Sequence, residues 1–132
     1  RCALEATCRA TVDDLAQLQA LHDKLERAAA AADADGYYRV NHDFHSLVQA
    51  IAANRWLDRA TGDLRRFMRL WRGRQLQLPG RIAASLNEHR VLMDAMHQRD
   101  ADRASRAMHD HLMAQLTALK ALQALEGQRQ HA

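Results

Sequence analysis

Histidine is the residue type in this sequence best suited to chemistry, and eight histidines occur among the 132 residues. On a helix that turns about 100° per residue, His89 and His111 fall in the middle of apolar stripes, and His45 lies on the flank of a third stripe. The others lie off an apolar face, on its flank, at a helix end or in the tail: His22, His42, His97, His109 and His131. Three separate helices are therefore expected to point one imidazole each toward the interior.

Buried imidazoles need a partner for each ring nitrogen, because an unpaired polar atom in an apolar interior costs free energy. A divalent cation could take one lone pair from each of His45, His89 and His111. The same pattern also fits three core histidines that each find a separate hydrogen-bond partner. Neither His-Glu-x-x-His nor Glu-x-x-His occurs in the sequence, which argues against a ferritin-like di-iron bundle.

The elements that must position these histidines are predicted to be helices. Hydrophobic residues make up 48% of the chain, and it contains a single proline. Its six valines and isoleucines are too few for a sheet, whereas alanine, leucine and arginine, which favour helices, are abundant. The composition predicts an all-α fold, an antiparallel bundle of six or seven helices. The whole chain, residues 1–132, is expected to form a single domain.

Caps and breaks divide the chain into predicted helices. Thr11 and Asp14 form a capping-box pattern, and Asn54 and Asp100 are expected N-caps. The clearest loop is Leu78-Pro79-Gly80. The predicted helical ranges are 1–10, 11–32, 37–53, 55–75, 81–97 and 101–126.

The formal net charge is +3, and arginines are densest between residues 59 and 81. We interpret this stretch as a solvated helix face rather than a nucleic-acid surface, because its aromatic residues, Phe67 and Trp71, fall on the apolar side. No apolar run is long enough to span a membrane. The opening residues lack a signal peptide and an initiator methionine, so a trimmed chain with two reduced thiols, Cys2 and Cys8, is expected in the cytoplasm.

Several short segments, taken in their order and spacing, resemble one known family. They are Asn41-His42-Asp43-Phe44-His45, Asn54, Glu88-His89-Arg90 and Ala107-Met108-His109-Asp110-His111-Leu112. With the opening Arg1, Leu4 and Glu5, they resemble the C-terminal effector domain of FadR-type regulators in the GntR family, called the FCD domain, as far as about Leu116. The resemblance implies an all-α bundle of six or seven helices. It also implies a divalent metal, which many members of the family hold.

By this resemblance four residues would hold the metal: Asn41, His45, His89 and His111. The first ligand in the family is usually aspartate, and the amide of Asn41 would leave the site one charge more positive. Zinc is the first expectation for the metal, with nickel, manganese or iron as alternatives. The resemblance further implies a small organic acid beside the metal. Three polar residues are the expected contacts for its carboxylate: Arg65, Arg72 and Gln115.

The resemblance also implies a regulator of transcription rather than an enzyme. An N-terminal winged-helix domain, absent from this chain, would bind DNA, while this domain would form a homodimer, sense the acid and alter DNA affinity. One alternative is a metal-dependent hydrolase or hydratase, but the inward faces offer it no general acid or base, because Glu88 and Asp110 lie off the apolar stripes. The other alternative is a helical interaction module that binds no ligand.

Overall fold

The computed structural model describes residues 1–71 and 73–131, apart from the side chains at 55–58, 61, 64, 67 and 68. In chain order, the elements within these residues are α1 (Cys2–Arg9), α2 (Val12–Ala30), α3 (Ala34–Ala52), α4 (Arg55–Leu70), the short 3₁₀ helix η1 (Arg74–Gln77), α5 (Arg81–His97) and α6 (Ala101–Gln130). The described residues contain no strand, which confirms the all-α prediction.

Side-chain caps set where several of these helices begin. Thr11 accepts a hydrogen bond from the backbone N–H of Asp14, and the Asp14 carboxylate accepts one from the Thr11 N–H. The predicted capping box is therefore confirmed. Asp100 caps α6 in the predicted way. Asp33 caps α3, so that helix begins at Ala34 and not at residue 37.

The prediction for the end of the fourth helix is wrong. α4 ends at Leu70 rather than Gln75, and η1 follows it. Between them, Gly73 adopts a left-handed φ of 67°, where a Cβ atom would lie 2.5 Å from the ring of Tyr38. Because glycine alone fits this geometry without strain, the chain turns here and η1 packs back against α3.

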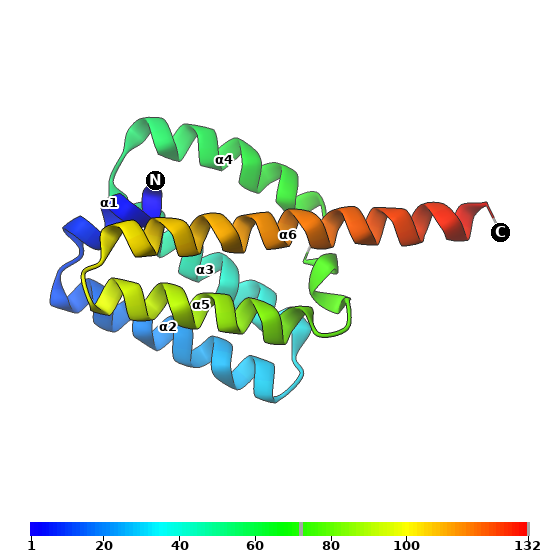
Figure 1. Cartoon of the computed structure of the whole chain (residues 1–132), viewed down its shortest axis with the longest axis horizontal. Helices are drawn as coiled ribbons and strands as arrows, with labels where there is room; N and C mark the ends of the chain where they lie inside the picture. Colours follow the sequence, from blue (N-terminus) through cyan, green and yellow to red (C-terminus); the bar gives the residue numbers. More distant parts are fainter. Residues whose placement is uncertain (72, 132) are drawn as a thin grey trace.

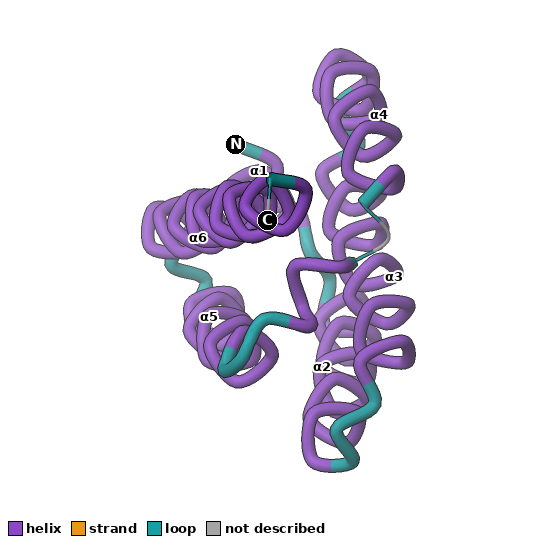
Figure 2. The backbone as a smooth tube through the Cα atoms, turned by 90° about the vertical axis from the view of Figure 1, so that its right-hand side faces the viewer, coloured by secondary structure: helices purple, strands orange, loops and turns teal. Residues whose placement is uncertain are grey.

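The helices are arranged in two layers. Figure 2 shows α5 and α6 side by side in one layer and α2, α3 and α4 in the other. The layers are joined by contacts of α2 with α5, and of α1 with both α3 and α6. The main core includes Leu18, Phe44, Leu92 and Met96, each no more than 1% exposed. Apolar side chains from both layers therefore meet along the length of the helices.

A second group of buried residues lies at the η1 end of the fold: Leu25, Tyr37, Leu76 and Leu86. Here the Tyr37 hydroxyl donates a hydrogen bond to Ser85 Oγ at 2.9 Å, which ties α3 to α5. Figure 1 shows α6 continuing past the ends of the other helices to the C-terminus. None of the helices, within the described residues, has the length and apolarity needed to cross a bilayer.

Candidate metal centre

Three histidines meet where the two layers face each other. His45 comes from α3, His89 from α5 and His111 from α6. One ring nitrogen from each lies within 4.8 Å of the others, and the Nε2 atoms of His45 and His111 are 3.2 Å apart. The structure thus brings together the three imidazoles that the helix faces point inward, although they are far apart in the chain.

Ring packing holds this arrangement. Phe44, which is fully buried beside His45 on α3, packs edge-on against His89 with ring centroids 4.8 Å apart. The rings of His45 and His111 are stacked, with 9° between their planes and 5.2 Å between their centroids. The core residue next to His45 therefore also orients a second imidazole.

The spacing of the nitrogens fits a shared cation. Zinc binds imidazole nitrogen at about 2.0–2.1 Å, which places two tetrahedral ligand nitrogens roughly 3.3–3.4 Å apart. The separation of 3.2 Å between His45 and His111 is close to this value. The largest separation, up to 4.8 Å, would shorten by about 1.4 Å on binding. The three imidazoles are therefore a suitable donor set for one divalent cation.

Glu88 determines which nitrogen of His111 faces the other imidazoles. Its Oε1 atom lies 2.7 Å from His111 Nδ1. Because an ionised carboxylate can only accept, Nδ1 carries the proton and Nε2 directs its lone pair toward His45. Histidines that bind metals are commonly oriented by a carboxylate in this way.

The charge of Glu88 is maintained by a buried arginine. Both carboxylate oxygens accept hydrogen bonds from Arg81, at 2.8 and 2.9 Å, and Arg81 is only 8% exposed. Burial raises the pKa of Glu88, but the hydrogen bonds from Arg81 and His111 outweigh it and lower the pKa to about 2. Glu88 is therefore ionised at neutral pH and remains an acceptor for His111.

The environment of His89 most directly indicates a ligand. His89 is 1% exposed, and neither of its ring nitrogens has a hydrogen-bond partner among the described residues. Burial, and then the adjacent His45 and His111, lower its pKa well below the usual range, so the ring is neutral. A buried polar atom without a partner costs about 1–3 kcal/mol. Coordination to a cation would remove this cost for one nitrogen.

Asn41 lies one helical turn before His45 on α3. It is 9% exposed, and its Oδ1 atom has no hydrogen-bond partner among the described residues. Asn41 and His45 line the same cavity. A carbonyl-type oxygen suits several divalent ions, so the buried acceptor fits the predicted first ligand.

A cavity of about 450 Å³ lies between α1, α3, α4, η1 and α6, and of the three clustered histidines His45 lines it. Gln115 lines it, and without a metal its amide donates to His111 Nε2 at 3.1 Å, so a metal bound at that nitrogen would release the amide. Arg65 also lines it, and its guanidinium donates to Gln49, to Ser46 and to the backbone carbonyl of His42. Arg72 lies outside the described residues. Two of the three predicted effector contacts therefore border one cavity with His45.

The model of the FCD domain family matches residues 1–114, which include the three histidines and Asn41. The chain belongs to the FCD domain family. A search of curated proteins found no match to it. FCD domains are regulatory domains that sense a small-molecule effector and work with a DNA-binding partner domain. The cluster of three histidines in this FCD domain is placed to hold a metal ion.

Two polar residues of this FCD domain were missed by the sequence analysis. Glu88 was placed off the apolar stripe of its helix, yet it contacts both Arg81 and His111. Gln75 was placed at the end of a long helix, yet it is 5% exposed in η1 and lines the cavity, and its Oε1 has no partner within the described part of the chain. For Glu88 the sequence did contain one signal: Arg81 lies seven residues before it, on the same face of the predicted helix.

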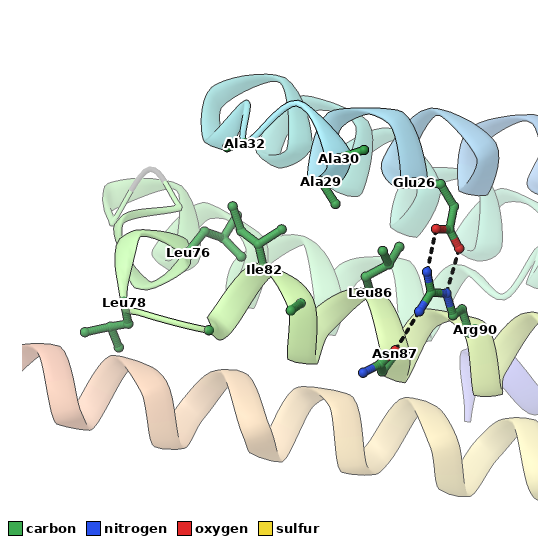
Figure 3. Close-up of a pocket in the computed structure, with 12 residues that line it drawn as sticks. Glu26, Ala29, Ala30, Ala32, Leu76, Leu78, Ile82, Leu86, Asn87 and Arg90 are labelled. Carbon is green, nitrogen blue, oxygen red and sulfur yellow. Dashed lines mark hydrogen bonds and ion pairs between the residues drawn. The ribbon is translucent and has the colours of Figure 1, made fainter.

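A second cavity of the FCD domain, about 540 Å³, lies between α2, η1 and α5 (Figure 3). Most of its lining is apolar, and the charged side chains at its edge, Glu26 and Arg90, form an ion pair with each other at 2.6 Å. It is larger than the cavity beside the histidines. However, none of its described lining residues is a predicted ligand, so we assign the chemistry to the smaller cavity.

Proposed function

We propose that this FCD domain is the effector-sensing domain of a FadR-type regulator in the GntR family. It binds one divalent metal ion through His45, His89 and His111, with Asn41 as a further ligand. A small organic acid binds beside the metal, with Arg65, Arg72 and Gln115 as its contacts. The observation that carries the proposal is His89, a buried neutral imidazole next to two other imidazoles, with no hydrogen-bond partner among the residues that the structure describes.

Zinc is the metal we propose, with nickel, manganese and iron as alternatives, because three neutral imidazoles suit a borderline metal. When bound, the metal supplies open coordination positions and positive charge for a carboxylate. Around it, Gln115 donates from its side-chain amide and Arg65 contributes a cation at the cavity wall. The amide of Asn41 in place of a carboxylate adds no negative charge, which favours an anionic effector.

We propose a regulatory rather than a catalytic role for this site. A metal-dependent hydrolase would need a free acid or base beside the metal. Glu88 is the carboxylate that contacts a proposed ligand, and Arg81 and His111 already occupy its oxygens. It is therefore suited to orienting His111 and not to transferring protons to a substrate.

At the level of the whole regulator, the proposal includes a homodimer, a six-helix antiparallel bundle spanning residues 1–132, and DNA binding by a separate N-terminal winged-helix domain in the cytoplasm. The effector would shift the population between two arrangements of the DNA-binding domains. In the full-length regulator, metal and acid together should change operator affinity in a gel-shift titration.

The test of the metal proposal is an elemental analysis of protein purified without chelator and dialysed against zinc. Wild type should retain about one zinc per chain, and His89→Ala should retain much less than one. His109→Ala is the matched control, because His109 is an exposed histidine on α6. Equal zinc in wild type and His89→Ala would contradict the proposal.

The role of Asn41 has its own test. Asn41→Asp would replace a neutral amide oxygen with a carboxylate, which binds divalent ions more strongly. We expect calorimetry to show tighter zinc binding by about tenfold or more, the size of one added charge–charge interaction near a metal. Unchanged affinity would show that Asn41 is not a metal ligand.

A further inference from the structure

We infer that the effector of this domain is amphiphilic: a monocarboxylic acid whose carboxylate lies at the metal centre and whose apolar body lies along α6. The inference rests on the proposed function and makes its effector more specific. It distinguishes medium-chain or aromatic acids from short hydroxy acids and from di- and tricarboxylic acids.

The wall of the cavity along α6 is mostly apolar, with Gln115 as its polar residue. Met108, Leu112, Leu116 and Leu119 all line it, and their spacing of four, four and three residues puts them on one face of the helix. At 1.5 Å per residue this strip is about 17 Å long. It begins at the turn before His111 and leads away from the metal centre.

The middle of this strip is unusually exposed for large apolar side chains. Leu112 is 40% exposed and Leu116 is 43% exposed, whereas Met108 and Leu119 at its ends are buried. Val48 lines the same cavity from α3. An apolar ligand body along the strip would remove this surface from water, at about 25 cal/mol for each Å². A ligand body made of hydroxyl or carboxylate groups would not gain this free energy, because it has little apolar surface to bury.

The cavity has buried polar residues in its lining. Asn41, Gln75 and Gln115 are buried and line it together with His45, and none of the described residues that line the cavity is acidic. One anionic head can lie beside His45, whereas further carboxylates of the same ligand would lie against the apolar strip.

Two arginines of α4 supply positive charge to the cavity, which favours an anionic ligand. Arg65 and Arg69 lie one turn apart on α4 and both line the cavity. No ion pair between either arginine and a described acidic residue is present. Arg65 already donates to three neutral groups, so its charge can attract an anion toward the metal without a large rearrangement.

The volume supports a ligand larger than the shortest acids. A cavity of about 450 Å³ corresponds to roughly fifteen water-sized groups at about 30 Å³ each. Lactate and succinate, with about six and eight heavy atoms, would fill no more than roughly half of it at that packing. An acid of about eight to ten carbons would fill most of it.

The test is calorimetry on the zinc-loaded protein with acetate, butanoate, hexanoate and octanoate, and with lactate, succinate and citrate. Each methylene removed from water is worth a factor of about four in Kd. Because part of the strip is open to solvent, we expect octanoate to bind at least about tenfold more tightly than butanoate. We expect the same advantage over lactate, succinate and citrate.

A matched pair of variants locates the effect. Leu116→Gln puts a polar group in the strip and should weaken octanoate binding about fivefold or more, with little change for butanoate. Leu125→Gln is the control, because Leu125 is 49% exposed on the same helix and does not line the cavity. Equal losses in both variants would overturn the inference.

The remaining outcomes separate this inference from the proposed function. If zinc binds and the short or multiply charged acids bind as tightly as octanoate, the amphiphilic effector is wrong and the sensor of a small acid stands. If zinc binds and none of these acids binds, both the effector inference and the acid-sensing part of the proposed function are wrong. If zinc itself does not bind, the metal proposal is wrong, and the effector inference is wrong with it, because it places the carboxylate at the metal.

Discussion

At the residue scale, the metal centre depends on a chain of contacts from Arg81 through Glu88 to His111. Arg81 holds both oxygens of Glu88, and Glu88 holds Nδ1 of His111. The proton on Nδ1 leaves the Nε2 lone pair for a metal ion, and the negative charge of Glu88 makes that lone pair more basic. Glu88 thus orients His111, a proposed ligand, without being a proposed ligand itself.

Glu88→Gln should therefore weaken zinc binding. The amide oxygen can still accept from His111, but the negative charge is lost, so we expect a decrease of about tenfold, the lower end of the range for groups that orient metal ligands. Competition with a chromophoric chelator measures it. Glu26→Gln is the control, because Glu26 also pairs with an arginine but lies on α2 at the other cavity. Unchanged zinc affinity in Glu88→Gln would show that the charge of Glu88 does not support metal binding.

His89 gives the metal-free domain a defined dependence on pH. Its pKa is lowered well below the usual value by burial and by His45 and His111. Between that lowered pKa and about 6.5, the unfolded chain binds a proton at His89 that the folded domain does not. The contribution of His89 to stability is therefore complete above about pH 6.5 and decreases as the pH falls.

Urea denaturation in the presence of chelator measures this effect. From pH 6.5 to 5.5 we expect the free energy of unfolding to fall by about 1 kcal/mol through His89, within the limit of about 1.4 kcal/mol per pH unit for one group. Glu88 does not interfere, because its pKa is about 2 in the folded domain and its contribution is lost only below about pH 4.5. The free energy of unfolding should change less with pH in His89→Leu than in wild type. An equal change in both would show that His89 is not its source.

Helical periodicity was enough to find the imidazoles but not their partners. His89 and His111 were identifiable because burial of a helix face repeats with a fixed period. Glu88 was not, because its position off the stripe becomes partly buried only when α6 brings His111 against it. Gln75 was missed for a similar reason, since its burial depends on how η1 packs against α3.

At the scale of the elements, local signals predicted where helices begin better than where α4 ends. The caps at Thr11 and Asp100 depend only on residues within three positions of each other, and both are present. The end of α4 depends on Gly73, whose backbone is left-handed and packs on Tyr38 of α3. This contact is made across the fold, so a helix pattern continuing to Gln75 could not reveal it.

Gly73→Ala should destabilise the domain. An alanine at this left-handed φ costs about 1–2 kcal/mol, and its Cβ would press on the ring of Tyr38. We expect a loss of about 2 kcal/mol in the free energy of unfolding, with weaker packing of η1. Gly62→Ala is the control, because a Cβ there meets nothing within 4 Å and alanine favours the interior of α4 by about 0.5–1 kcal/mol. Similar effects from both substitutions would contradict this account of the turn.

At the scale of the whole molecule, the histidine cluster lies where the two helical layers meet. One proposed ligand belongs to the layer of α3, and two belong to the layer of α5 and α6. A cation bound by all three histidines would link the layers, and ligand bound beside it would be sensed by both. This placement explains how a small acid could alter the arrangement of the domain and, through it, a DNA-binding partner.

The most direct test of the central claim is X-ray absorption spectroscopy at the zinc edge on the protein loaded with one equivalent of zinc. The account predicts three imidazole nitrogens at about 2.0–2.1 Å, together with oxygen ligands. His89→Ala should lower the imidazole count or abolish stoichiometric binding. A wild-type spectrum with fewer than three imidazoles, or one dominated by sulfur from Cys2 or Cys8, would contradict a metal centre formed by His45, His89 and His111.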